Sequence, residues 1–469
     1  MSSSLKFSFN FFLSRSGLDI LFFWVARMVM MGLELTDTLP FHTVFLHAMV
    51  RDKEGRKMSK SLGNVIDPLE VIGGCSLDAL QDRLDSGNLP EKEVARAKKN
   101  NEAEFPAGIP ECGSDALRFG LLAYTVQGRD INLDVKRVVS YRMFCNKLWN
   151  ATKFALTFLD DFKPTQNLLK EVMESGKIAP RDRFMISKMM NTASSVNDYL
   201  DNYKFGDAQQ AAYSYWMEDL CGTYLELIKP VVKSDDKDAK WAAQSTLWLA
   251  LESGLRLLHP MMPYVSEELW QRLPGRGTLG SDEPDTIMLA PYPEAIEEYK
   301  NEAAESAMND VMEVVKAGRS LRSSYNIKNK DLTFFILKAS GSFETSAKAQ
   351  TDDILTLARG SALKINPPES EIPETVGTIV ANDQLTLLMD MKGLVDYKVE
   401  INRLKKTLKS TTGPLETLKR KMEADGYEEN VPEDLKKTNI EKLESYTKKM
   451  EEIESAIKDF ERLDALESK

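Results

Sequence analysis

Histidine and cysteine are scarce in this chain, with three and four residues among 469. The cysteines are Cys75, Cys112, Cys145 and Cys221, which are widely spaced and form no CxxC pair. A disulfide framework or a structural zinc site needs closely spaced ligands, so the sequence argues against both. We therefore expect a reduced, cytosolic setting and no metal ligands in the chain.

A long hydrophobic run is also lacking. A helix that crosses a bilayer needs roughly 18 to 20 consecutive apolar residues. The nearest candidate, Ile20–Leu35, is interrupted by Arg27 and Glu34, so we interpret it as a buried helix and expect no membrane association. The apolar run in residues 1–17 is too short and broken to indicate secretion.

An excess of basic residues is missing as well, because 61 Lys and Arg against 72 Asp and Glu leave a net charge of −11. On its own this balance disfavours nucleic-acid binding, and we expect no DNA partner. Nucleic-acid binding needs only a local basic surface, however, so charge has to be considered segment by segment. The length is too great for one core and suggests roughly three or four units.

Hydrophobic periodicity predicts a multidomain, mainly α-helical chain. An α/β part ends in a strand at Thr43–Val50 and is followed by a charged, exposed helical insertion. A helix bundle comes next, then a Gly- and Pro-rich linker at Leu273–Glu294, and a small α/β unit with strands at Leu332–Ala339 and Thr378–Met389. The expected segments are 1–68, 69–133, 134–294, 295–390 and 391–469.

Two local features accompany this division. At Ser114-Asp115 we expect a side chain to cap the following helix. Five tryptophans are expected to build the core of the bundle: Trp149, Trp216, Trp241, Trp248 and Trp270.

The last segment repeats apolar residues every three and four positions in two arms. The arms are separated by the turn ADGYEENVPED. Two heptad-patterned helices joined by a turn predict an antiparallel coiled coil. Gly413-Pro414 is expected to break and kink the first arm.

One lysine-rich loop has a sequence that suggests a chemical role. Residues 57–61 read KMSKS, follow the expected strand and are bracketed by Gly55 and Gly63. Two lysines with interleaved hydroxyl groups can hold a polyphosphate on a loop that is able to move. A lysine-rich turn is in general only a solvated loop, but this pentapeptide together with Gly63-Asn64 and Asp67-Pro68 is specific.

With this motif the chain resembles class I aminoacyl-tRNA synthetases. The resemblance implies that residues 1–68 are the C-terminal remnant of a Rossmann-type catalytic fold, and that the loop binds ATP, which brings Mg²⁺. Lys57 and Lys60 would be catalytic, neutralising the departing pyrophosphate. The other expected ATP-loop residues are Met58, Ser59 and Ser61.

The run SGLDILFFWVARM, residues 16–28, is similar to the valyl-tRNA synthetase family, whose usual Thr-Gly-Tyr-Asp is Ser16-Gly17-Leu18-Asp19 here. The resemblance places Asp19 near the ribose or the ammonium group of the adenylate and Trp24 near the valine side chain. The alternative for Trp24 is a core helix. The partners implied are valine, ATP and tRNA(Val).

Later segments also resemble this family, as a stem-contact segment, an anticodon-binding bundle and a tRNA-binding arm in the eukaryotic form. Arg142, Asn146 and Lys147 would face tRNA from the bundle, or form an ordinary polar face. The tail candidates are Arg403, Lys405 and Lys406, which could equally be a solvated coiled-coil flank.

The second class signature, His-x-Gly-His, is not present, because His42, His47 and His259 do not fit it. The family resemblance places that element and the proofreading domain before residue 1. We therefore expect the function of a valine–tRNA ligase by family, with this chain weak or inactive alone. The alternative is a non-catalytic tRNA-binding or scaffold protein derived from a synthetase.

Overall fold

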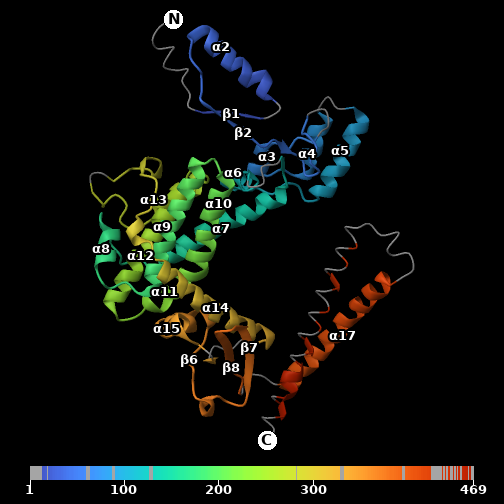
Figure 1. The fold of residues 1–469 in the computed structure, drawn as a ribbon. Helices are drawn as coiled ribbons and strands as arrows, with labels where there is room; N and C mark the ends of the chain where they lie inside the picture. Colours follow the sequence, from blue (N-terminus) through green and yellow to red (C-terminus); the bar gives the residue numbers. More distant parts are fainter. Residues whose placement is uncertain are drawn as a thin grey trace. The chain divides into compact units, whose positions relative to one another are not determined.

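The computed structural model describes residues 13–17, 20–59, 64–86, 90–125, 130–280, 283–327, 332–337, 339–392, 394 and 397–423. Towards the C-terminus it also describes 436, 439, 442–443, 447, 450, 453–454, 457–462 and 464–465. The chain divides into two compact units, residues 1–301 and 302–469 (Figure 1).

Unit 1 begins with a parallel strand pair. β1 (Leu13–Gly17) pairs in parallel with β2 (Thr43–His47). The crossover between them is a π-helical turn, η2 (Leu21–Val25), that continues into α2 (Ala26–Thr36). A parallel pair requires such a crossover, so this is a β-α-β arrangement.

The expectation that Ile20–Leu35 forms a buried helix is wrong for the described chain. Helix is present, but within η2 and α2 only Val25 and Gly32 are buried. Phe22 is 77% exposed and Met30 is 68% exposed. Apolar residues occupy nearly every position of this helix, so packing on one face leaves most of them exposed.

A second parallel pair joins distant parts of unit 1, because β3 (Val50–Arg51) lies beside β4 (Ile131–Asn132). Between these strands the chain forms α3 (Pro68–Gly73), α4 (Leu77–Asp85), α5 (Glu91–Glu104) and α6 (Ser114–Ala123). The charged insertion is thus an α4–α5 helical hairpin. It buries Leu80, Leu84 and Ala97.

The remainder of unit 1 is mainly a helix bundle. Its helices are α7 (Val135–Leu156), α8 (Leu168–Glu174), α9 (Pro180–Asp201), α10 (Phe205–Ser214), η5 (Tyr215–Tyr224), α11 (Leu225–Val231), α12 (Lys237–Leu258) and α13 (Pro263–Gln271), followed by the short η6 (Ile287–Leu289) and η7 (Glu297–Tyr299). Trp216 is fully buried and donates to Gly254 O at 3.1 Å. A Cβ on Gly254 would lie 2.9 Å from the Tyr215 ring, so only glycine lets these helices approach.

Two expectations about the bundle are corrected. Trp149 is 40% exposed and does not belong to the core, whereas Trp248 and Trp270 are buried. Asp115 does not cap its own helix: the N-cap of α6 is Gly113, which makes no side-chain cap. The Asp115 carboxylate instead accepts from Val265 N at 2.7 Å, at the start of α13.

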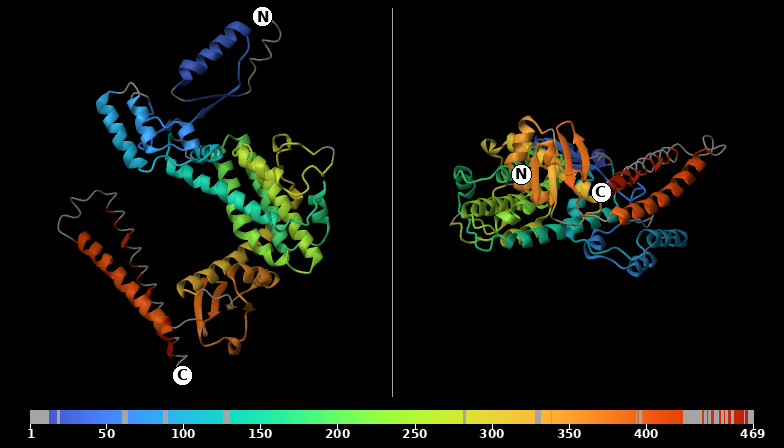
Figure 2. Two further views of the ribbon diagram at one scale, coloured as in Figure 1. Left: turned by 180° about the vertical axis from the view of Figure 1, so that it is seen from behind. Right: turned by 90° about the horizontal axis from the view of Figure 1, so that it is seen from below.

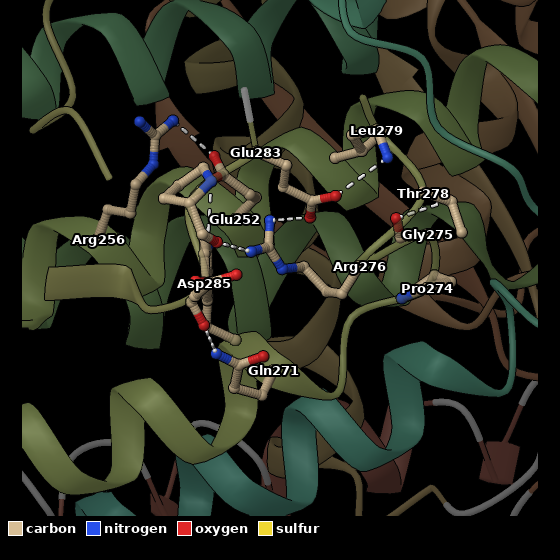
Figure 3. A network of polar contacts seen from close by, with 12 residues as sticks. Glu252, Arg256, Gln271, Pro274, Gly275, Arg276, Thr278, Leu279, Glu283 and Asp285 are labelled. Atoms are coloured by element: carbon tan, nitrogen blue, oxygen red, sulfur yellow. Dashed lines mark hydrogen bonds and ion pairs between the residues drawn. The ribbon is translucent and has the colours of Figure 1, made fainter. Parts of the chain in front are cut away.

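The segment Leu273–Glu294 is packed against the bundle, so its interpretation as a linker is wrong. Arg276 lies 3.3 Å from the centre of the Trp270 ring and pairs with Glu283 at 2.5 Å (Figure 3). Glu252 accepts from Trp270 Nε1 at 3.2 Å and from Arg256 at 2.6 Å. Arg256 also donates to Pro291 O at 2.6 Å, and Trp248 Nε1 donates to Pro274 O at 3.0 Å, so contacts from α12 hold the segment in place.

Unit 2 contains a four-stranded sheet in the order β6-β5-β8-β7. Its strands are β5 (Thr333–Leu337), β6 (Ala362–Ile365), β7 (Val376–Asn382) and β8 (Leu385–Asp390). The expected strand Thr378–Met389 is therefore two strands of an antiparallel hairpin. The helices of this part are α14 (Glu302–Ser324), α15 (Gly341–Ala349), α16 (Thr351–Ala358) and the short η8 (Glu369–Glu371).

The tail begins with α17 (Tyr397–Met422), which is one helix through Gly413-Pro414. The expected break is therefore wrong. Helical positions of the return arm lie alongside α17 (Figures 1 and 2), and Lys405 pairs with Glu461 at 2.8 Å. Each side of this pair buries apolar residues at heptad spacing: Ile401, Leu404 and Leu415, and Ile453, Ile457 and Phe460.

Candidate functional site

The base of the lysine loop is held together by one carboxylate. Asp52 is 5% exposed and accepts from Arg56 N and Arg56 Nε, both at 2.7 Å. It also accepts from Asn64 Nδ2 at 2.8 Å. Burial alone would raise the pKa of Asp52, but the hydrogen bonds from Asn64 and Arg56 lower it below its usual value.

Asn64 ties the two ends of the loop to each other. Its Oδ1 accepts from Ser59 N at 3.0 Å, and its Nδ2 reaches Lys57 O at 3.3 Å. Lys57 also forms an antiparallel bridge with Arg51 in β3. The turn between them uses Gly55 at φ +79°, a conformation that favours glycine.

The loop residues expected from the sequence are placed as follows. Lys57 is exposed, whereas Met58 and Ser59 are half-buried. Lys60, Ser61 and Asp19 lie outside the described residues. Trp24 is 62% exposed in η2. The exposed Lys57 ammonium group on a pinned loop base is able to meet a polyanion from solvent.

The α4–α5 hairpin supports the far end of the same loop. Arg83 of α4 donates to Val65 O at 2.9 Å and pairs with Glu70 at 2.5 Å. A cavity of about 250 Å³ separates the hairpin from the loop base and is lined by Asp52, Arg56 and Glu104 among others. Burial and the neighbouring Glu54 raise the pKa of Glu104.

The structure places only some of the residues expected to contact tRNA from the bundle close together. Arg142 and Asn146 of α7 line one groove, whereas Lys147 is exposed and does not line it. In the tail, Arg403, Lys405 and Lys406 are exposed on α17. Lys405 is engaged by Glu461, so its charge is partly neutralised.

The sequence pointed to Asn64 as part of the motif, but it did not point to Asp52 and Arg83, which also support the loop. Asp52, Asn64 and Arg83 carry no chemistry themselves, and no family motif was matched to Asp52 or Arg83. The turn DKEG, an acidic residue three positions before a glycine, was the signal available for Asp52. Arg83 lies 18 residues from Val65 in the sequence, so only the fold reveals its contact.

Within the described residues, no three or more side chains of histidine, cysteine, aspartate or glutamate come close enough to hold a metal ion. Across the same part of the chain, no helix combines the length and the apolar character needed to span a bilayer.

Two family models match the chain. Residues 2–134 match tRNA synthetases class I (I, L, M and V), and residues 182–336 match the anticodon-binding domain of tRNA ligase. The first match includes the lysine loop, and the second includes most of the helix bundle after α7.

Curated relatives match nearly the whole chain. The valine–tRNA ligase of Rattus norvegicus is 43% identical over 453 residues, which cover 96% of this chain and 35% of the relative. A mitochondrial valine–tRNA ligase of Arabidopsis thaliana is 43% identical over 91% of this chain and 39% of the relative. The mitochondrial enzyme of Saccharomyces cerevisiae is 39% identical, covering 97% and 41%.

The chain therefore spans about a third to two fifths of the length of these relatives. Among solved structures, a ternary complex of Agrobacterium radiobacter LeuRS with tRNA and LeuAMS is similar at 20% identity with a TM-score of 0.42. That match covers 62% of this chain and 29% of the other.

Proposed function

We propose that this chain belongs to the valine–tRNA ligase (valyl-tRNA synthetase) family of class I tRNA synthetases. From this premise, it supplies the ATP loop and the tRNA-binding surfaces of a valine–tRNA ligase. The reaction is the activation of valine by ATP and the transfer of the valyl group to tRNA(Val). The observation that carries the proposal is the lysine loop on the base formed by Asp52 and Asn64.

In this proposal the loop acts on the triphosphate. Lys57 and Lys60 neutralise the charge that builds on pyrophosphate as the valine carboxylate attacks the α-phosphorus. Met58, Ser59 and Ser61 complete the loop. ATP brings its own Mg²⁺, which shares this charge.

The contact from Asn64 to the Ser59 amide supports this role, because catalysis by positioning needs a loop whose base is held. Asp19 and Trp24 are proposed to border the adenylate and the valine side chain.

The proposed tRNA contacts lie in both units. Arg142, Asn146 and Lys147 come from the first helix of the bundle. Arg403, Lys405 and Lys406 come from the tail, which we propose is an antiparallel coiled-coil arm. RNA phosphates dominate affinity in such contacts, so local basic groups can act despite the net charge of −11.

We retain within the proposal the five segments 1–68, 69–133, 134–294, 295–390 and 391–469. They correspond to a partial Rossmann-type catalytic domain, a stem-contact segment, an anticodon-binding bundle, a small α/β unit and the arm. A cytosolic setting is also proposed, although the relatives include mitochondrial enzymes.

A chimera tests the proposal directly. This chain replaces the matching 453 residues of the Rattus norvegicus ligase, and valine-dependent exchange of pyrophosphate into ATP is measured together with charging of tRNA(Val). We expect an active chimera. Lys57→Ala with Lys60→Ala should lower the exchange rate about 100-fold or more, because preorganised charge at the leaving group is lost.

The matched control is Lys53→Ala, an exposed lysine of the same turn that is not part of the motif. It should change the rate by less than about two-fold. Equal rates for the parent chimera and the double variant would show that the loop has another role. A chimera that charges no tRNA, beside an active rat enzyme, would refute the proposed function.

A further inference from the structure

A groove of about 540 Å³ lies between α7 and α13 in unit 1. The start of α6 closes one end of it. Polar and aromatic side chains line it, among them Arg142, Asn146, Trp149, Tyr264 and Glu268.

The side chains form two matching rows. On α7, Arg142, Asn146 and Trp149 are spaced by four and three residues, so they share one face of the helix. On α13 and its C-cap, Tyr264, Glu268 and Arg272 are spaced by four. At about 1.5 Å per residue each row is roughly 10 to 12 Å long.

Contacts along the groove fix how the rows face each other. Asp115 accepts from Val265 N at 2.7 Å and lines the groove together with Arg142, which marks one end. The guanidinium of Arg272 lies 5.3 Å from the centre of the Trp149 ring, which marks the other. An arginine and an aromatic ring are therefore available at each end.

The two aromatic side chains are unusually open to solvent. Trp149 is 40% exposed and Tyr264 is 68% exposed, although both residues belong to well-packed helices. Exposed aromatic faces next to guanidinium groups are the surfaces on which unstacked bases of RNA stack.

The two carboxylates that line the groove, Asp115 and Glu268, already have hydrogen-bond partners. Asp115 is occupied by the backbone amides of α13, and Glu268 is occupied by Arg272, from whose Nε it accepts at 2.9 Å. Arg142 is half-buried and makes no hydrogen bond or ion pair within the described part of the chain. Its Nη1 would lie 3.7 Å from a Cβ on Gly113, so it reaches the floor of the groove.

We infer that the α7–α13 groove binds one unstacked nucleotide of tRNA, with the base on Trp149 and Tyr264 and the phosphate at Arg142. The Asn146 amide, which both donates and accepts, lies between them and is placed for the edge of the base. This inference rests on the proposed function, and it names the part of the RNA that this surface takes.

Binding of a tRNA(Val) transcript to the full 469-residue chain tests the aromatic contacts. We expect Trp149→Ala and Tyr264→Ala each to weaken binding by about ten-fold, because stacking of one base is lost. The slope of log affinity against log salt should stay unchanged, since stacking releases no counterions. Trp149→Phe keeps a stacking face and should restore most of the affinity.

The phosphate contact has a different signature. Arg142→Gln should reduce the salt slope by about 0.7 to 0.9, the value for one lost phosphate contact. The matched control is Lys233→Gln, which removes an exposed charge of the same unit outside the groove. Leu289→Ala, at a side chain 71% exposed outside the groove, is the control for the aromatic variants.

The outcomes separate the two proposals. One outcome is that the parent chain binds tRNA and the folded variants Trp149→Ala, Trp149→Phe and Tyr264→Ala all bind it as tightly as the parent does. The groove assignment is then overturned, and tRNA binding stands. If the parent chain binds no tRNA at low salt, the proposed function itself fails. Equal losses in Leu289→Ala and Tyr264→Ala would also overturn the groove assignment.

Discussion

At the scale of single residues, Asp52 organises the base of the lysine loop. Its carboxylate accepts hydrogen bonds from the chain before the motif, through Arg56, and from the chain after it, through Asn64. Because all three donors favour the charged form, the pKa of Asp52 is lowered in the folded state despite its burial. The geometry of the loop base is thus tied to the ionisation of one group.

This coupling predicts a pH-dependent stability. A carboxyl group with a lowered folded pKa stabilises the fold above its unfolded value, 3.8 here, and loses that contribution as the pH falls through the folded pKa. We expect Asp52→Asn to lower the thermal unfolding midpoint of unit 1 by roughly 2 to 6 °C at pH 7. The difference from wild type should shrink as the pH falls below 3.8 and through the lowered folded pKa of Asp52.

The control for Asp52 is Glu54→Gln, because the Glu54 carboxylate is exposed where it pairs with the same Arg56 at 3.3 Å. It should shift the midpoint very little at any pH. Calorimetry across pH 3 to 7 measures both differences. A constant deficit of Asp52→Asn at every pH would mean that packing, and not charge, is what Asp52 contributes.

At the scale of elements, long periodic segments could be located from the sequence and turns could not. The strand expected at Leu332–Ala339 is β5, Thr333–Leu337. The expected strand Thr378–Met389 is instead a hairpin, because Asn382 and the two residues after it form a tight turn inside an otherwise continuous β pattern. Pro414 did not stop α17, since flanking turns and packing offset its missing donor.

One contact of the return arm predicts how the tail is anchored. Phe460 is fully buried, with its ring centre 5.1 Å from that of Tyr325 and 6.0 Å from that of Tyr397. We expect Phe460→Ala to reduce the free energy of unfolding of unit 2 by about 3 to 5 kcal/mol, through lost burial and an unfilled cavity. Hydrogen exchange in α17 should become faster. Denaturant unfolding and exchange measurements check both effects.

The neighbouring Glu461→Gln provides the control for this prediction. Glu461 pairs with Lys405 at 2.8 Å, but both side chains are about half exposed, so the pair contributes less than about 1 kcal/mol. If both variants reduce stability equally, the anchor is the ion pair and not the aromatic cluster.

At the scale of the whole molecule, residues of the candidate site could be predicted only where they belong to a short sequence motif. KMSKS predicts an ATP loop, and the family resemblance predicts that α7 contacts tRNA; both stay predictions. The aromatic groove was missed because Trp149 has the spacing of a core residue, and Tyr264 is brought beside Arg142 only by the packing of α13 on α7. Contacts between distant segments have no signature in local periodicity.

The exposure of the part proposed to bind the nucleotide predicts how the 469-residue chain behaves alone. Trp24 is 62% exposed and Lys57 is exposed, so neither group acts in a water-excluded site in the described chain. Charge stabilisation of a leaving group is weak in water and strong in a preorganised, water-excluded site. The surfaces proposed for tRNA, by contrast, are already exposed and need no such enclosure.

We therefore expect one preparation of the chain to bind tRNA(Val) and to give valine-dependent pyrophosphate exchange no higher than a blank without valine. Filter binding and exchange are measured side by side, with the Rattus norvegicus ligase as the positive control for exchange. Exchange that rises with valine and falls in Lys57→Ala would show that the exposed loop is sufficient for catalysis. It would also mean that the exclusion of water from the site contributes less to the rate of this reaction than the weakness of charge interactions in water implies.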